Sequence, residues 1–97
     1  MYFSLLQRHI LKECFAKKGE AVHRRVFHVF YRNKKITRKD AINTITKCME
    51  RLIDSGLLIG YGTRTTQKWF IREVKITRRG IKHWIEWIES RQAKLPF

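Results

Sequence analysis

The chain has 97 residues, 43% of them hydrophobic, which is enough for one domain with a small core. It has no run near the roughly 18 apolar residues of a membrane span, and its N-terminus lacks the pattern of a secretory signal. These features argue against a membrane-spanning or secreted chain. We therefore expect residues 1–97 to form a single intracellular domain, in the cytoplasm or nucleoid, without a membrane partner.

The charge is strongly positive and unevenly distributed. Twenty-two Lys and Arg against eight Asp and Glu give a formal net charge of +14. Residues 17–82 carry 18 basic and 5 acidic side chains, a net of +13, whereas the two ends together carry +1. Such a field favours a phosphate polyanion, because each neutralised phosphate releases a condensed counterion. The charge indicates a nucleic acid in preference to a role in solubility or to an anionic membrane surface.

Patterns typical of catalysis or metal binding are missing from the sequence. It has no glycine-rich phosphate loop, no G-x-S-x-G and no carboxylate cluster. The four histidines lack H-x-x-x-H spacing, and Cys14 and Cys48 form no C-x-x-C. We expect no catalytic residue, no metal and no cofactor. Two buried thiols are the simpler interpretation of the cysteines, and a Cys14–Cys48 disulfide remains the alternative.

Two helices are predicted in the first third of the chain. Phe3, Leu6, Ile10 and Cys14 recur at helical spacing and predict a helix over residues 3–17, which Gly19 ends. A second helix is predicted over residues 20–33. Its VFHVFY segment is also compatible with a strand, but its apolar positions do not alternate. The basic run HRR at 23–25 is compatible with a solvent-facing position.

The third predicted helix covers residues 37–55. Thr37 and Asp40 form a T-x-x-D variant of the capping box, and Gly56 supplies a left-handed C-terminal cap. One face of this helix is apolar. The opposite face carries Lys39, Asp40, Asn43, Thr44, Lys47, Glu50, Arg51 and Asp54. The helix is therefore amphipathic, and the exposed side of its first turns is basic.

A hairpin and a last helix complete the chain. LLIGYG and KWFIREVKI predict two strands around the polar turn TRTTQ. The apolar positions of the second strand change parity, which predicts a bulge near Arg72. Thr77 is expected to cap a helix over residues 77–93, whose apolar face includes Trp84 and Ile88. The predicted fold is mainly α with a small β-hairpin, in the order helix-helix-helix-strand-strand-helix.

The block MERLIDSGLLIGYGTRTTQKWFIREVKITRRGIKHW resembles winged helix-turn-helix regulators, most clearly in LIDSGLL and ITRRG. It is similar to the PadR and MarR groups and to small stand-alone regulators of archaea and their viruses. The likeness covers residues 20–88. It implies double-stranded DNA as the partner and transcription regulation as the role, in the host cytoplasm if the source is a virus. Two features depart from the pattern: the segment from Thr37 to Gly56 is about one turn longer than usual, and the wing is short.

The resemblance implies which residues meet DNA. Helix 37–55 would be the recognition helix in the major groove, with wing 60–70 on the minor groove or backbone. The expected recognition-helix contacts are Arg38, Lys39, Asn43, Thr44, Lys47 and Arg51. The expected wing contacts are Arg64 and Lys68, and the expected backbone contacts are Lys34 and Lys35. The alternative is a solvated face on an ordinary core helix, with a hairpin tip carrying ordinary charges.

The terminal helices suggest a homodimer interface. Their region is nearly neutral and rich in aromatic residues, which suits self-association. The expected interface residues are Phe3, Leu6, Trp84, Trp87 and Ile88, and the alternative is that they are simply core. No effector domain is evident, so no small-molecule ligand is expected. Two alternative functions remain. One is nucleic-acid binding without sequence preference, as in an architectural or RNA-binding protein, and the other is a winged helix that binds another protein.

Overall fold

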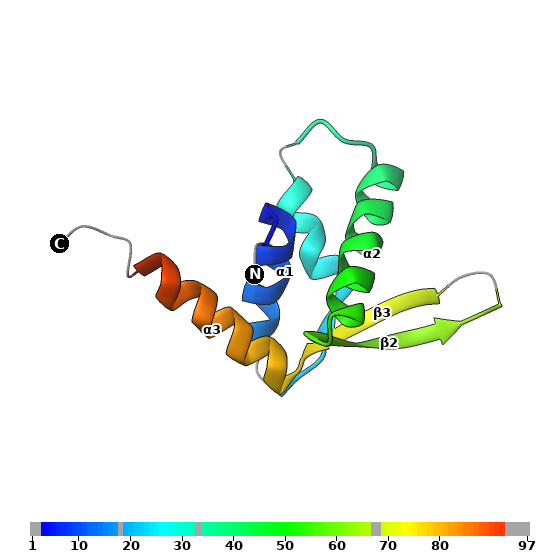
Figure 1. Cartoon of the computed structure of the whole chain (residues 1–97). Coiled ribbons are helices and arrows are strands. Elements are labelled where there is room, and N and C mark those ends of the chain that lie inside the picture. Colours follow the sequence, from blue (N-terminus) through cyan, green and yellow to red (C-terminus); the bar gives the residue numbers. More distant parts are fainter. Residues whose placement is uncertain (1–2, 18, 33, 67–68, 93–97) are drawn as a thin grey trace.

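The computed structural model describes residues 3–17, 19–32, 34–66 and 69–92 of the chain. Its elements follow in the order α1 (Leu5–Ala16), β1 (Val22–His23), the 3-10 helix η1 (Arg24–Tyr31), α2 (Arg38–Asp54), β2 (Leu58–Arg64), β3 (Trp69–Ile76) and α3 (Arg78–Gln92). The three strands form an antiparallel sheet in the order β1-β3-β2. The hairpin of β2 and β3, hereafter the wing, and the helix α3 project from the body in opposite directions (Figure 1). The predicted mainly α fold with a small hairpin is confirmed.

One core lies among α1, η1, α2 and the sheet. Apolar side chains at helical spacing on α1 and α2 face each other, and alternate residues of the strands face both helices. The most deeply buried large side chains include Phe3, Ile10, Phe27, Met49 and Leu57. Within the described residues, no polar or charged residue is buried as a whole. The charged side chains are therefore left at the surface, where they can act on a partner.

The segment after α1 differs from the predicted helix over residues 20–33. Val22 and His23 form the short strand β1, which pairs with Val74 and Glu73 of β3. Residues 24–31 then form a 3-10 helix in place of an α-helix. The prediction of one regular helix was wrong because sheet pairing took its first residues. The remaining run of β-branched and aromatic residues has a modest helix propensity, which suits a short, tight helix.

The caps of the long helices follow the sequence closely. Thr37 Oγ1 accepts a hydrogen bond from the Asp40 backbone N–H at 3.1 Å, which fixes the start of α2 next to the predicted position. Gly56 follows α2 with a φ of 78°, the left-handed conformation expected of it. Thr77 Oγ1 likewise accepts from the Gly80 N–H at 2.9 Å and caps α3. The first helix is shorter than predicted, since Ser4 caps it.

The wing contains the predicted bulge. Tyr61 pairs with Glu73, and the next residue of β2, Gly62, pairs with Ile71, so Arg72 is the extra residue on β3. The bulge explains the change of parity in the sequence: Val74 and Ile71 are both buried, although they stand three positions apart. A bulge also increases the local twist. The outer part of the wing is thus turned relative to its base.

Candidate nucleic-acid interface

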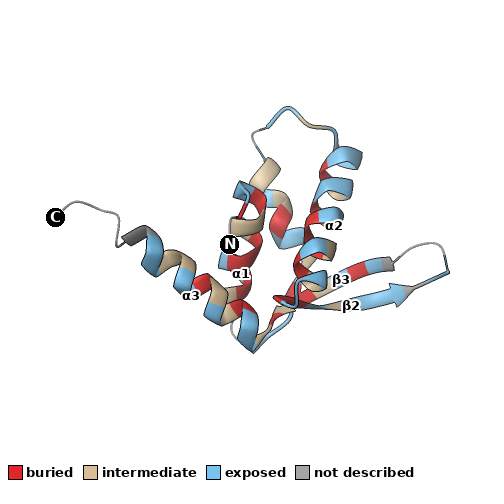
Figure 2. Cartoon of the chain, in the orientation of Figure 1, coloured by how far each residue is buried: buried red, intermediate tan, exposed pale blue. Residues whose placement is uncertain are grey.

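The helix α2 presents one face to the core and the other to solvent. Its buried residues are Ala41, Ile45, Cys48, Met49 and Leu52. Figure 2 shows the pale blue, exposed side of α2 turned away from α1 and from the base of the sheet. Since the core fixes the apolar face, it also fixes which side chains the helix offers to a partner.

All six residues predicted on the recognition helix lie on its exposed side, namely Arg38, Lys39, Asn43, Thr44, Lys47 and Arg51. Thr44 Oγ1 donates to the Asp40 carbonyl at 2.8 Å, which orients the hydroxyl but leaves its oxygen able to accept. The first turn carries two cations, Arg38 and Lys39, against one acidic residue, Asp40, whereas Glu50 and Asp54 balance Lys47 and Arg51 in the last turns. The N-terminal half of α2 is therefore the half suited to an anionic partner.

The loop before α2 adds two exposed lysines, Lys34 and Lys35. The Nζ of Lys34 lies 4.7 Å from the centroid of the Phe30 ring. This cation–π contact limits the positions of the ammonium group without burying it. The predicted backbone contacts thus stand beside the start of α2, one of them already supported by an aromatic ring.

The wing carries two of the predicted DNA contacts, Arg64 and Lys68. The side chain of Arg64 and the whole of Lys68 lie outside the described residues. The described part of β3 offers Phe70, which is 51% exposed, and Arg72 at the bulge, which is also exposed. Arg72 lies 4.0 Å from Glu73, a surface ion pair worth little to stability. The wing therefore contributes an aromatic ring and a bulge cation that sequence reasoning did not single out.

A hollow of about 380 Å³ lies between α2 and the wing. It is lined by Arg24, Ile42, Asn43, Thr46, Lys47, Glu50 and Phe70. Two of the predicted recognition residues, Asn43 and Lys47, thus share a concave surface with β3. The structure thus brings the exposed face of α2 close to Phe70 of the wing, a proximity that the sequence could not show.

Arg24 and His28 are the residues that sequence reasoning missed. Arg24 was compatible with a solvent-facing position, but it is half-buried and makes hydrogen bonds to α2 and β3. Burial lowers the pKa of the Arg24 guanidinium, which nevertheless keeps its charge at neutral pH. Burial, followed by the charges of Arg24 and Arg38, lowers the pKa of His28. All three causes disfavour the charged imidazole, and they depend on packing that the sequence does not show.

The five residues predicted at a dimer interface gather where α3 crosses α1, but three of them are internal. Phe3, Leu6 and Trp84 are at most 7% exposed and belong to the core of the single chain. Trp87 stacks on Trp84 with ring centroids 5.3 Å apart and, like Ile88, is only partly buried. The surface here that a second chain could contact consists of these two residues together with Leu5 and Ile85, which are 63% and 37% exposed.

The two cysteines are free and buried, so the simpler interpretation of them is confirmed. Burial raises the pKa of Cys14 to about 12 and that of Cys48 to about 11. In the described ranges, no three His, Cys, Asp or Glu side chains are grouped as a metal site would require. None of the described helices is long and apolar enough to cross a membrane.

The chain matches no family model and no curated relative. Its fold, however, matches solved winged-helix structures of transcription regulators. TA0346 of Thermoplasma acidophilum, provisionally assigned as a transcriptional regulator, superposes with a TM-score of 0.63 at 16% identity, over 92% of this chain and 82% of its own. The likeness establishes the winged-helix fold predicted from the sequence.

Two bacterial proteins extend the comparison. A mutant of ZitR from Lactococcus lactis has a TM-score of 0.62 at 14% identity, over 96% of this chain and 56% of its own. A mutant of MepR from S. aureus has a TM-score of 0.60 at 15% identity, over 97% of this chain and 67% of its own. This chain thus spans little more than half of ZitR. At such low identity, the shared feature is the fold.

Proposed function

We propose that the protein is a transcription regulator that binds double-stranded DNA sequence-specifically as a homodimer. The observation that carries this proposal is the exposed face of α2, which joins cations and amide or hydroxyl side chains on one capped helix in a winged-helix fold. Cations alone would serve any polyanion. Asn43 and Thr44 add the hydrogen-bonding groups that read base edges.

In this proposal α2 enters the major groove by its N-terminal half. The groove is about 12 Å wide and admits one α-helix. Arg38 and Lys39 would meet phosphate or guanine, and Lys47 guanine or the backbone. Arg51, nearer the acidic end of the helix, would contact the backbone at the edge of the site. Lys34 and Lys35 precede the helix and would bind phosphates on the flanking strand.

The wing would lie on the adjacent minor groove or backbone through Arg64 and Lys68. An arginine at a hairpin tip suits a narrow minor groove, whose potential is strongly negative. The hollow between α2 and the wing supports this arrangement, because helix and wing share one concave side of the molecule. Both elements can thus contact one duplex at the same time.

The homodimer would form through α1 and α3. The helix α3 extends away from the other helices on the side opposite the wing, so pairing there leaves α2 free for DNA (Figure 1). Leu5, Ile85, Trp87 and Ile88 provide apolar surface in the least charged part of the chain. Two copies would then place two recognition helices on a DNA site with matching two-fold symmetry.

Selection of bound sequences from random duplex DNA tests the proposal. We expect an enriched palindrome, which would establish specificity and two-fold symmetry together. A dimer touching about eight phosphates should also give a log–log salt slope near −7. Tight binding with no enriched sequence would replace the proposal with architectural or RNA binding. A slope near zero would favour a protein partner.

A further inference from the structure

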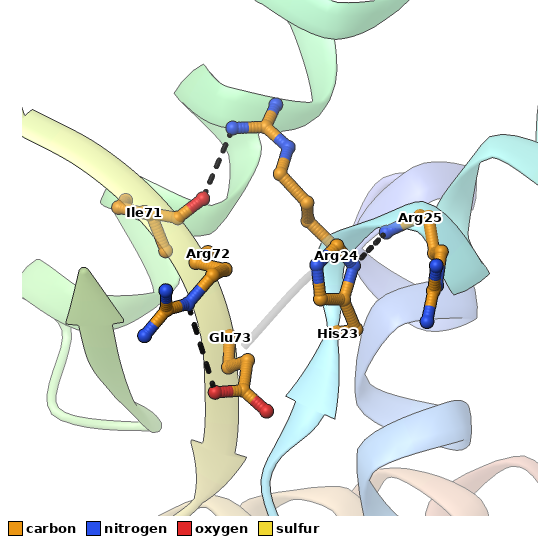
Figure 3. Close-up of polar contacts among 6 residues, drawn as sticks. All are labelled: His23, Arg24, Arg25, Ile71, Arg72 and Glu73. Atoms are coloured by element: carbon orange, nitrogen blue, oxygen red, sulfur yellow. Dashed lines mark hydrogen bonds and ion pairs between the residues drawn. The ribbon is translucent and has the colours of Figure 1, made fainter.

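Arg24 occupies the point where the sheet gives way to η1. The strand β1 pairs with β3 at two positions, Val22 with Val74 and His23 with Glu73. Arg24 follows at once, and its backbone leaves the sheet. Figure 3 shows its side chain reaching back to β3, where the backbone of β1 no longer runs beside it. The backbone pairing of β1 with β3 ends at His23, and the Arg24 side chain makes the next hydrogen bond to β3 in its place.

The guanidinium bonds two elements that are far apart in sequence. Nη1 donates to the carbonyl oxygen of Ile71 on β3 at 3.1 Å. Nη2 donates to the carbonyl oxygen of Ile42 at 3.1 Å and to Oγ1 of Thr46 at 2.6 Å, both on α2. Thr46 Oγ1 in turn donates to the same Ile42 oxygen at 2.9 Å. One side chain therefore bridges the middle of α2 and the part of β3 just beyond the bulge, on the tip side of the wing.

The bridge stands next to the residues proposed to read bases. Ile42 and Thr46 immediately precede Asn43 and Lys47 along α2, and all four line the same hollow. On the other side, Ile71 adjoins the bulge residue Arg72, where the wing changes its twist. Any change in the angle between α2 and the wing would have to stretch or break these charge-assisted bonds.

The chemistry of the bridge calls for arginine. The guanidinium is planar and presents its donors in a fixed fork, so two of its nitrogens can bond partners on opposite sides at once. A lysine carries the same charge on a single nitrogen and cannot span both elements. A charge of this kind is also costly to remove from water unless its donors are bonded, and these acceptors bond three of its five N–H groups.

We propose that Arg24 is a positioning residue that fixes the angle between the recognition helix α2 and the wing, so that discrimination by Asn43 requires the wing to be engaged on the same duplex. Only the claim about discrimination by Asn43 rests on the proposed function. The fixed angle is a property of the free protein. It can therefore be measured without DNA.

The first experiment measures the angle directly. Spin labels are attached through Lys39→Cys on α2 and Thr63→Cys on the wing, and their distance distribution is recorded by pulsed electron paramagnetic resonance. The native Cys14 and Cys48 are buried and should not be labelled. We expect one narrow distribution with Arg24 present and a clearly broader one in Arg24→Met and Arg24→Lys. Arg25→Met is the matched control, because it removes the same charge from the neighbouring residue, whose side chain is exposed.

The second experiment uses the selected DNA site and its single-mismatch variants. Arg24→Met should lower the ratio of affinities for site and mismatch by about tenfold, the change expected when a charge-assisted hydrogen bond is lost. The wing's minor-groove footprint should fade with it. Arg25→Met should leave both unchanged and reduce the salt slope by at most about 1, the contribution of one phosphate.

The outcomes separate the two claims. An unbroadened distribution in Arg24→Met overturns the fixed angle, whatever the DNA does, and so does full rescue by Arg24→Lys. If the distribution broadens but no DNA sequence is selected, the proposed function fails and the fixed angle stands. Thr46→Val removes one acceptor and little volume. If Arg24→Met does not fold, an unchanged distance and an unchanged ratio in Thr46→Val overturn the inference.

Discussion

The hydroxyl of Thr77 donates a hydrogen bond to the carbonyl oxygen of Gly56 at 2.7 Å. The same oxygen atom of Thr77 accepts from the Gly80 N–H, and the Thr77 backbone N–H donates to the Leu57 carbonyl at 3.1 Å. One residue therefore caps α3 and ties its start to the end of α2. The residues just before β2 and just after β3 are therefore joined by the residue that caps α3, and this closes the base of the wing.

We predict that Thr77→Ala lowers the free energy of unfolding by about 1–3 kcal/mol, the sum of a lost cap and a lost hydrogen bond. For a domain of this size, that corresponds to a fall in Tm of several degrees. Urea denaturation followed by circular dichroism measures it. Thr77→Ser should recover most of the loss, because serine keeps the hydroxyl. A loss of under about 0.5 kcal/mol in Thr77→Ala would contradict the double role.

Gly80→Ala should also destabilise the protein, against the ordinary preference for alanine in helices. A Cβ on Gly80 would lie 2.2 Å from the Leu57 carbonyl oxygen and 2.8 Å from the Ile76 side chain. Such overpacking typically costs about 1–3 kcal/mol, more than the roughly 1 kcal/mol that helix propensity would return. Thermal unfolding checks it, with exposed Lys82→Ala on the same helix as control. A rise in Tm for Gly80→Ala would refute the close contact.

The two thiols should resist alkylation in the native state. A pKa of about 12 for Cys14 and about 11 for Cys48 keeps both protonated at neutral pH. Because these pKa values are raised by folding, their contribution to stability is complete below pH 9 and declines as the pH rises toward 11 to 12. Reaction with a thiol reagent at pH 8 should be slow before denaturation and rapid after it. Fast modification of the folded protein would show that the thiols are accessible.

Two substitutions should separate base reading from backbone binding. Asn43→Ala should cost about 1–3 kcal/mol at one base-pair position, since an amide can bond adenine at two atoms. Arg64→Ala should weaken binding to all duplexes by a similar factor, because its expected partner is phosphate or groove shape. Affinities are measured on the selected site, on single mismatches and on unrelated DNA. If both variants lose affinity uniformly, the protein reads the backbone only.

The protein should sediment as a dimer at micromolar concentration. Ile85→Glu places a charge on the exposed apolar side of α3 and should give monomers that keep their helical content. Trp87→Glu should do the same, although it also removes the stack on Trp84 and the contact with Arg8, whose guanidinium lies 5.1 Å from the ring. Lys82→Ala is the control on the same helix. A wild-type monomer at high concentration would rule out the proposed interface.

Much of the fold could be predicted because its signals are local. The cap at Thr37, the left-handed Gly56 and the change of parity around Arg72 each depend on a few neighbouring residues. The helix over residues 20–33 was mispredicted because the strand β1 exists only through pairing with β3, some fifty residues away. Local propensity cannot register such a partner.

The candidate site could likewise be predicted only where its signals are local. The exposed residues of α2 follow from helical periodicity, which also places Asn43 and Lys47 on one side. The role of Arg24 did not follow, because its acceptors are 18 to 47 residues away and two of them are backbone carbonyls. Every residue has a backbone carbonyl, so the residue types of Ile42 and Ile71 do not indicate that they accept a hydrogen bond. The division of the aromatic cluster into core and surface likewise required the packing of α3 on α1.

The shortness of β1 has one more consequence. A sheet edge with unpaired backbone groups is a template on which another chain can add a strand, the first step of aggregation. The edge of β3 beyond Glu73 is such a place. There the Ile71 carbonyl is occupied by Arg24, and the bulge places the exposed charge of Arg72 next to it. Both features oppose the addition of a strand along this edge of β3.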